Sequence, residues 1–260
     1  MAEARAWISA LRDSHDRLLR LLEGLEPEQL SRPSECSEWT IAQVLSHLGS
    51  GAEIFSLILD AGLTDSEAPG NEAFPPIWDQ WNAKDPTVVV EDFKRVDSAF
   101  VEHWEGMDDN QLAAFKIAIF GMDLDASGLL ALRLSEHALH SWDVAAALDP
   151  GAKVSQAATD LLVDGLVRSA GRGGKPVGGP LRVHLETSNP HRRFTLSVDE
   201  NVLLAPHAEG DSLDGVAALE IPAEALLRLV SGRMDPDHTP AEVKADGVSL
   251  DSLRAVFPGF

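Results

Sequence analysis

The chain has 260 residues, and its 42 acidic side chains outnumber its 21 basic ones, giving a formal charge of −21 and an isoelectric point near 4.6. Phosphate binding needs a basic face, so this charge balance excludes nucleic acid as a partner and argues equally against anionic membranes. With 44% hydrophobic residues, the chain can build the core of one large domain or of two domains.

Two further features indicate the compartment. Cys36 is the only cysteine, so no intrachain disulfide can form, which fits a reducing environment. The N-terminal residues lack the basic and then apolar pattern of a signal peptide, and the longest apolar runs fall short of a membrane span. We therefore predict a soluble cytoplasmic protein.

The first half of the chain has the apolar spacing of helices. The predicted helices cover residues 4–25, 40–62, about 87–106, and 129–148. Thr40 and Gln43 form a capping box at the start of the second helix, and Trp39 and Val44 form a candidate hydrophobic staple. We read residues 62–86 and 107–126 as long loops. This pattern predicts a four-helix bundle over residues 1–150.

After Pro150 the pattern changes to mixed helices and strands. Alternating apolar and polar residues predict strands at 181–187 and 192–198, with further candidates at 201–207, 215–221 and 243–247. Helices are expected at 155–170, 221–232 and 250–257. Residues 151–260 are thus predicted to form a second, smaller α+β domain with an antiparallel sheet.

The helix at 129–148 carries ionisable residues where a core helix has aliphatic ones. Leu129, Leu132 and Leu139 define its predicted apolar stripe, and Glu136 and His140 lie in or beside that stripe, four residues apart on one face. Burying an ionisable group without a partner costs several kcal/mol. A carboxylate and an imidazole directed together into a core are therefore typical of a divalent metal site.

A third ligand is available from the second helix. His47 lies near its centre, on or next to the buried face, and three protein ligands would leave one position for water or substrate, as in catalytic zinc sites. Asp143, three residues after His140, is a candidate to hydrogen-bond a ligand imidazole or a metal-bound group.

Spacing alone leaves other interpretations open. Glu136 and His140 could form a partly exposed salt bridge, and His47 could be a core histidine bonded to a carbonyl. His137 is expected at the surface, and Cys36 is expected to be a spare thiol. The other histidines, His15 among them, show no ligand-like spacing, and we expect core aromatics in Trp39, Trp104 and Trp142.

Two segments resemble a known family. WTIAQVLSHLGSGAEI resembles the second-helix signature of the DinB/YfiT-like metal-binding bundles, and RLSEHALHSWDVAAAL resembles the fourth-helix signature of the mycothiol-dependent maleylpyruvate isomerase family. The resemblance implies a metal centre, zinc or another divalent ion, held by His47, Glu136 and His140. It also implies a sterol-carrier-like C-terminal domain with a Leu-x-x-Gly-Arg segment. LRLVSGRMD matches that segment loosely and places Arg233 in it.

The activity that the resemblance implies is thiol chemistry. A metal with an open position favours the thiolate of mycothiol, or of a related low-molecular-weight thiol, as a nucleophile. Addition to an electrophilic small molecule, followed by bond rotation and elimination, gives a cis–trans isomerase, whereas a stable thioether gives a thiol S-transferase. The loops at 62–86 and 107–126 would shape the substrate pocket.

Arg233 has two candidate roles in this chemistry. It could stabilise charge on the substrate oxygen or bind a substrate carboxylate, and it could equally be a surface arginine at a helix end.

The alternative to an enzyme is a non-catalytic metal-containing protein that binds a small molecule or lipid. A three-ligand shell with an open position argues against it, because structural zinc is usually held by four protein ligands. The sequence leaves open which metal and which thiol are used, and whether the protein is a monomer or a homodimer.

Overall fold

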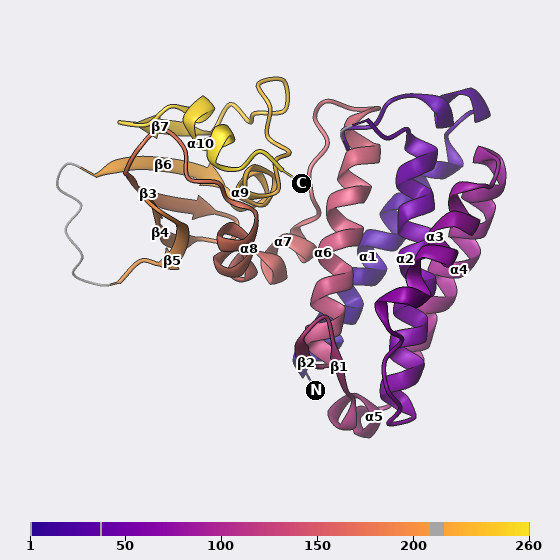
Figure 1. Ribbon diagram of the computed structural model, residues 1–260. Helices are drawn as coiled ribbons and strands as arrows, with labels where there is room; N and C mark the ends of the chain where they lie inside the picture. Colours follow the sequence, from indigo (N-terminus) through magenta and orange to yellow (C-terminus); the bar gives the residue numbers. More distant parts are fainter. Residues whose placement is uncertain (1, 37, 209–215, 260) are drawn as a thin grey trace. The chain divides into compact units, whose positions relative to one another are not determined.

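The computed structural model describes residues 2–36, 38–208 and 216–259, and Figure 1 shows the course of the chain. The chain divides into two compact units, residues 1–152 and residues 153–260. We call them the bundle unit and the sheet unit and describe each by itself.

Four long helices build the bundle unit, as predicted. They are α1 (Ala2–Glu23), α2 (Ile41–Leu63), α4 (Pro86–Gly106) and α6 (Ala126–Ala146). Helix α2 packs mainly on α4, and α1 mainly on α6. Leucine, isoleucine, valine and aromatic side chains from these helices fill a buried core, which includes Leu18, Leu45 and Phe93. Burial of this apolar surface drives the helices together.

Helix α2 is the central helix of this unit. With 23 residues, this helix is long and apolar enough to span a membrane by length and composition alone. The expectation that every apolar run falls short of a membrane span is therefore wrong. About two thirds of its apolar window (67%) is buried inside the protein, as in the core helix of a globular bundle. Its start was predicted correctly, because Thr40 and Gln43 form the capping box.

The predicted loop at 62–86 contains a helix. After the turn η2 (Asn71–Ala73), α3 (Phe74–Asn82) packs on α2. Pro75 and Pro76 were read as signs of a loop, but they lie in the first turn of α3, where proline is tolerated.

Specific contacts hold α3 on α2. The Trp81 ring is buried against Gly49, where a Cβ would overlap it, and Trp81 Nε1 donates to Glu53 Oε2 (2.8 Å). Ser46 Oγ donates to Asn82 Oδ1 (2.8 Å). One stripe of α2 is therefore the contact surface for α3.

The predicted loop at 107–126 is also structured. It contains α5 (Asp109–Ala114) and a hairpin of β1 (Lys116–Ile119) and β2 (Met122–Asp125). Phe120 and Gly121 form its two-residue turn, both with positive φ (54° and 72°), as type I′ hairpin turns require. A short turn helix, η1 (Pro27–Ser31), links α1 to the turn before α2.

The sheet unit begins with helices. The predicted helix at 155–170 is divided into α7 (Gln156–Leu162), η3 (Val163–Gly165) and α8 (Leu166–Gly173). The five strands are β3 (Leu181–Ser188), β4 (Arg192–Val198), β5 (Val202–Pro206), β6 (Ala217–Pro222) and β7 (Lys244–Asp246). Helices α9 (Ala223–Val230) and α10 (Leu250–Val256) complete the unit. Of the strand predicted at 215–221, Gly215 lies outside the described residues.

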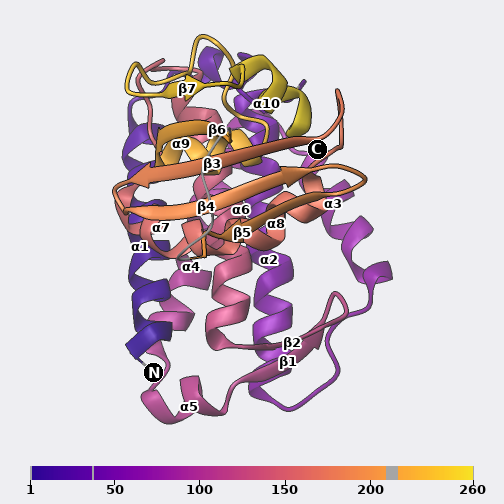
Figure 2. The ribbon, with the colours of Figure 1, turned by 90° about the vertical axis from the view of Figure 1, so that its left-hand side faces the viewer.

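The strands are ordered β5-β4-β3-β6-β7. Neighbouring pairs are antiparallel, as predicted, except β3 and β6, which run parallel. Figures 1 and 2 show α8 and α9 on one face of this sheet. Val183 and Leu185 of β3 are buried, whereas His184 and Glu186 between them are only partly buried. This alternation is the period of a half-buried strand and confirms an α+β unit.

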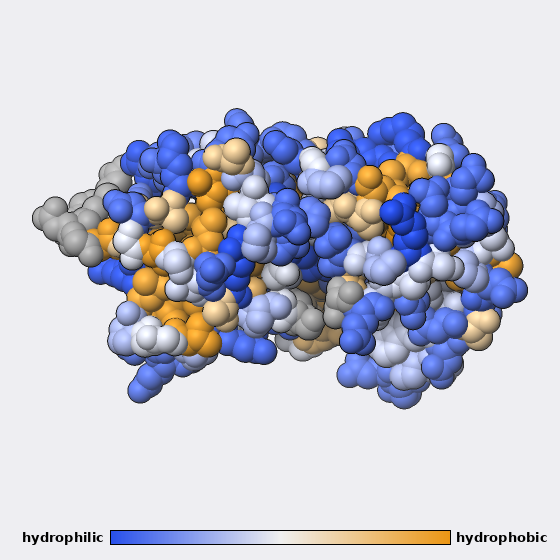
Figure 3. All heavy atoms as spheres, turned by 90° about the horizontal axis from the view of Figure 1, so that it is seen from above, coloured by the Kyte–Doolittle hydropathy of each residue, from blue (hydrophilic) through white to orange (hydrophobic). Residues whose placement is uncertain are grey.

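The outer surface agrees with the acidic composition. Figure 3 shows one face on which hydrophilic residues predominate and hydrophobic ones form smaller groups. Among the described residues, large exposed hydrophobic side chains are few and include Trp39, Trp78 and Phe120.

Candidate metal centre

Helices α2 and α6 bring the predicted ligands together. His47 lies in the second turn of α2, and Glu136 and His140 lie one turn apart in the second half of α6. His47 Nε2 is 3.1 Å from Glu136 Oε2, and His140 Nε2 is 3.7 Å from the same oxygen. One ligand atom from each residue lies within 4.8 Å of the other two.

These distances fit a metal ion. A tetrahedral site with bonds of about 2.0–2.2 Å places its ligand atoms roughly 3.3–3.6 Å apart. The two measured distances to Glu136, 3.1 and 3.7 Å, bracket that range. The donor set of two imidazoles and one carboxylate suits zinc and several other divalent ions.

Asp143 determines which nitrogen of His140 is available to bind a metal ion. The buried Asp143 Oδ2 lies 2.8 Å from His140 Nδ1. Because a carboxylate only accepts hydrogen bonds, we assign the hydrogen of the imidazole to Nδ1. Nε2 is then the nitrogen that faces the Glu136 carboxylate, 3.7 Å away. Carboxylate–histidine pairs of this kind orient metal ligands.

The cluster is open to solvent on the Glu136 side. The exposed fraction of the side chain is 49% for Glu136, 34% for His47 and 12% for His140. The prediction that Glu136 points into the core is therefore wrong. The buried stripe of α6 also differs from the predicted one, because Leu130, Leu134 and His137 are buried while Leu132 and Leu139 are only partly so.

The charge of Glu136 is stabilised by its neighbours. Burial by itself would raise the pKa of this carboxyl, but the hydrogen bond from His47 and the electrostatic influence of His140, His47 and Arg133 lower the pKa below its ordinary value. The Glu136 carboxylate is therefore anionic at neutral pH, as a metal ligand would have to be.

Two residues beside the cluster were not expected there. Trp39 was predicted to be a core aromatic, yet its side chain is partly exposed and its ring lies against both imidazoles. Cys36 was predicted to be a spare thiol, yet its sulfur lies within 4.8 Å of ligand atoms of His140 and Asp143. Both belong to the turn before α2, and sequence spacing carries no signal that this turn reaches α6.

A second group of histidines and a carboxylate lies deeper in the bundle. Asp97 Oδ2 accepts hydrogen bonds from His15 Nδ1 (2.6 Å) and His137 Nε2 (3.1 Å), and Asp97 Oδ1 accepts one from Arg133 Nη2 (2.6 Å). All four side chains are buried. The expectation that His137 lies at the surface is therefore wrong.

Serine hydroxyls complete this Asp97 cluster. Ser98 Oγ donates to His15 Nε2 (3.1 Å), and Ser14 Oγ donates to His137 Nδ1 (2.8 Å). Burial by itself would raise the pKa of Asp97, but His137, Arg133 and His15 lower the pKa well below its usual range. Burial lowers the pKa of His137, an effect that Asp97 only partly opposes. The cluster is therefore an Asp97–Arg133 ion pair beside two imidazoles whose ring nitrogens all have protein hydrogen-bond partners.

The Asp97 cluster also connects the two helices that carry the candidate metal ligands. Arg133, three residues before Glu136, donates from Nη2 to the carbonyl of Leu48 (2.9 Å), the residue after His47. This bond fixes α2 and α6 relative to each other close to the candidate metal centre.

Arg233, the predicted substrate-binding residue, lies in the sheet unit directly after α9. Its Nη1 donates to the carbonyl of Ser231 (3.1 Å), and Gly232 before it has a positive φ of 74°. Its role stays a prediction.

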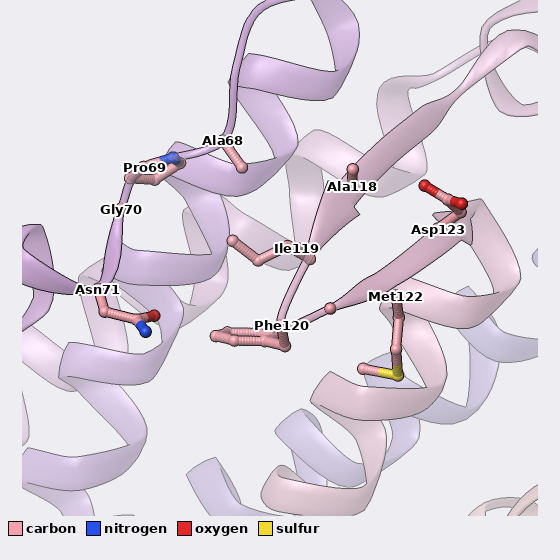
Figure 4. A pocket seen from close by; sticks show the side chains of 10 residues that line it. Ala68, Pro69, Gly70, Asn71, Ala118, Ile119, Phe120, Met122 and Asp123 are labelled. Carbon is pink, nitrogen blue, oxygen red and sulfur yellow. The ribbon is translucent and has the colours of Figure 1, made fainter.

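A surface depression of about 510 Å³ lies between the segments 68–71 and 118–123. In Figure 4 Ile119 and Phe120 point across it towards the segment from Ala68 to Asn71. These segments belong to the two regions expected to shape the substrate pocket. The depression adjoins the start of α6, however, whereas Glu136 and His140 lie about 15 and 21 Å further along that helix, at 1.5 Å per residue. It is therefore separate from the ligand cluster.

The geometry defines a class of protein: a helical bundle with a His–Glu–His cluster of metal-ligand type, combined with a small α+β unit. The profile of the "Mycothiol maleylpyruvate isomerase N-terminal domain" family matches residues 11–145, more than half of the chain. The chain belongs to this family.

Known structures share the fold. A crystal structure of the mycothiol-dependent maleylpyruvate isomerase matches with a TM-score of 0.67 and 15% identity, covering 93% of this chain and 92% of that one. A mutant of that isomerase matches with a TM-score of 0.68 and 14% identity over the same shares. At these identities the likeness concerns the fold alone.

One curated relative also matches. A Geobacillus thermodenitrificans (strain NG80-2) protein named "Putative metal-dependent hydrolase" is 35% identical over 65 residues, which is 25% of this chain. The match spans only 36% of that relative.

Proposed function

We propose that the protein is a divalent-metal enzyme, with zinc as the proposed ion, that activates a low-molecular-weight thiol such as mycothiol for addition to an electrophilic substrate. The observation that carries the proposal is the convergence of His47 Nε2, Glu136 Oε2 and His140 Nε2, with His140 held by Asp143. Membership of the mycothiol maleylpyruvate isomerase family supports the choice of thiol.

The residues of the chain have separate tasks in this proposal. His47, Glu136 and His140 hold the ion, and Asp143 keeps the His140 lone pair on Nε2. When bound, the ion supplies a positive charge that favours the thiolate form of the cosubstrate. The half-exposed side of Glu136 provides access from solvent.

The reaction that fits is reversible thiol addition. The thiolate adds to the double bond of a cis enone-acid, the resulting single bond rotates, and elimination returns the thiol and the trans product. A cation near the substrate oxygen would stabilise the charge that develops there, and Arg233 is proposed for this role or for binding a carboxylate. If elimination does not follow, the product is a thioether and the enzyme is an S-transferase.

Metal analysis tests the centre. We expect purified protein to carry about one divalent ion per chain and His47→Ala to lose it while keeping its circular dichroism spectrum. His103→Ala is the matched control, since this histidine is partly exposed on α4 and faces Asp60 at 3.8 Å. Unchanged metal content in His47→Ala would reject the assignment.

Product analysis then separates the reactions. Protein, thiol and a cis enone-acid should give trans product with the thiol recovered if the enzyme is an isomerase, or a stable thioether if it is a transferase. Metal-loaded protein that binds the substrate but gives neither product would instead support the alternative of a non-catalytic binding protein.

A further inference from the structure

The indole of Trp39 lies against both candidate histidine ligands. Its ring centroid is 5.2 Å from that of His47 and 6.0 Å from that of His140, and its plane is within 23° of the His140 plane. The two imidazoles are 4.6 Å apart at 68°. Favourable aromatic pairs have centroids 4.5–7 Å apart, so the three rings contact one another pairwise.

Backbone hydrogen bonds hold Trp39 in this place. The carbonyl of Trp39 accepts from both the amide and the hydroxyl of Ser34 (2.8 Å each), and its amide donates to the carbonyl of Cys36 (3.0 Å). The amide of Glu35 donates to the carbonyl of Asp143 on α6 (3.1 Å). The turn that carries the indole is therefore attached to the helix that carries His140.

Core packing does not account for this placement. The exposed fraction of Trp39 is 36%, whereas Trp81 and Trp104 are fully buried. Trp78 is similarly exposed (43%), but its ring contacts Phe74. Trp39 thus differs from the other exposed tryptophan in what its ring contacts.

We propose that Trp39 is a positioning residue of the metal centre: its indole holds the imidazoles of His47 and His140 at the mutual orientation in which their Nε2 atoms converge with Glu136. This inference rests on the proposed function, because it requires that these residues bind an ion. The ring limits rotation of both imidazoles, and its electron-rich face favours the positive charge that an imidazole gains on binding a metal.

Cobalt(II) binding to the full chain tests the role, with affinity measured by competition against a chromophoric chelator. We expect Trp39→Ala to weaken cobalt affinity about tenfold, the lower end of what outer-shell partners of metal ligands contribute. The visible absorption bands of the bound cobalt should shift, because they report ligand geometry. Trp39→Phe, which keeps a planar ring, should restore both properties towards wild type.

Controls separate a positioning role from a structural one. Trp78→Ala removes an equally exposed indole and should leave cobalt affinity and spectrum unchanged. If Trp39→Ala does not fold, Trp39→Leu replaces it, because leucine keeps apolar volume without a ring. Wild-type affinity and unchanged bands in either folded variant would overturn the inference while leaving the metal centre in place. Wild-type protein that binds no cobalt, or binding that survives His47→Ala, would overturn the proposed function itself.

Discussion

Two clusters, each of histidines and a carboxylate, lie close together in the bundle. Comparing them shows which features separate a candidate metal site from a structural hydrogen-bond network. In the Asp97 cluster every imidazole nitrogen has a protein partner, and Arg133 neutralises the carboxylate. In the cluster of His47, Glu136 and His140, one nitrogen of each imidazole converges on the same carboxylate oxygen, and the Glu136 side is exposed. Both have the composition of a metal site, but only the second combines convergent ligand atoms with a side open to solvent.

The largest expected effect concerns the stability of the buried cluster. Asp97→Asn leaves the Arg133 charge buried without its counter-ion, so we expect the free energy of unfolding to fall by about 3–5 kcal/mol. Urea unfolding of metal-free protein measures it. A loss below 1 kcal/mol would mean that Asp97 is not the counter-ion of Arg133.

Acid should weaken the same cluster. The pKa of Asp97 is lowered in the folded protein, so the unfolded chain takes up its proton first, at a pH near 3.9. The stability contributed by Asp97 is therefore complete above that pH and is lost as the pH falls towards the folded pKa. Unfolding free energies measured from pH 6 to pH 3 should fall more steeply for wild type than for Asp97→Asn. Parallel curves would contradict this.

The next effect concerns the exposed cluster. Asp143→Asn changes the partner of His140 Nδ1 from a carboxylate to an amide, so we expect zinc affinity to fall about 10–100-fold. Chelator competition measures the change, with Asp97→Asn as the comparison variant. If Asp97→Asn weakened zinc binding more than Asp143→Asn, the division into a structural and a metal-binding cluster would be wrong.

The smallest expected effect is on the stability of metal-free protein. Glu136→Gln removes a half-exposed carboxylate, whose contact with His47 is screened by water, so the free energy of unfolding should change by less than about 1 kcal/mol. The same variant should bind zinc poorly. A stability loss as large as that of Asp97→Asn would show that Glu136 is also a structural residue.

The helices and strands were predictable where a local pattern was strong. The four bundle helices and the capping box of Thr40 were predicted, as was the alternation in β3 and β4. Helix α3 was missed because its prolines lie in the first turn, and the β1–β2 hairpin because its turn is Phe120-Gly121 rather than Asn-Gly.

The ligand cluster was predictable in part, because spacing on α6 pairs Glu136 with His140 and the family resemblance adds His47. The partners of His137 were not predictable, since Asp97 and Ser14 come from two other helices. Trp39 was missed because its ring contacts depend on how the turn before α2 lies on α6. These contacts are tertiary, and no spacing within one helix reports them.

Helix α2 contacts α3 and α6 through two adjacent stripes of its surface. Ser46, Gly49 and Glu53 contact α3, while His47 faces Glu136 on α6. One residue inserted between His47 and Gly49 would rotate the rest of the helix by about 100° and separate the two alignments. Relatives that keep both the α3 contact and the His47–Glu136 alignment should therefore have insertions and deletions after residue 63 and not within this helix. An alignment of homologues can check this rule.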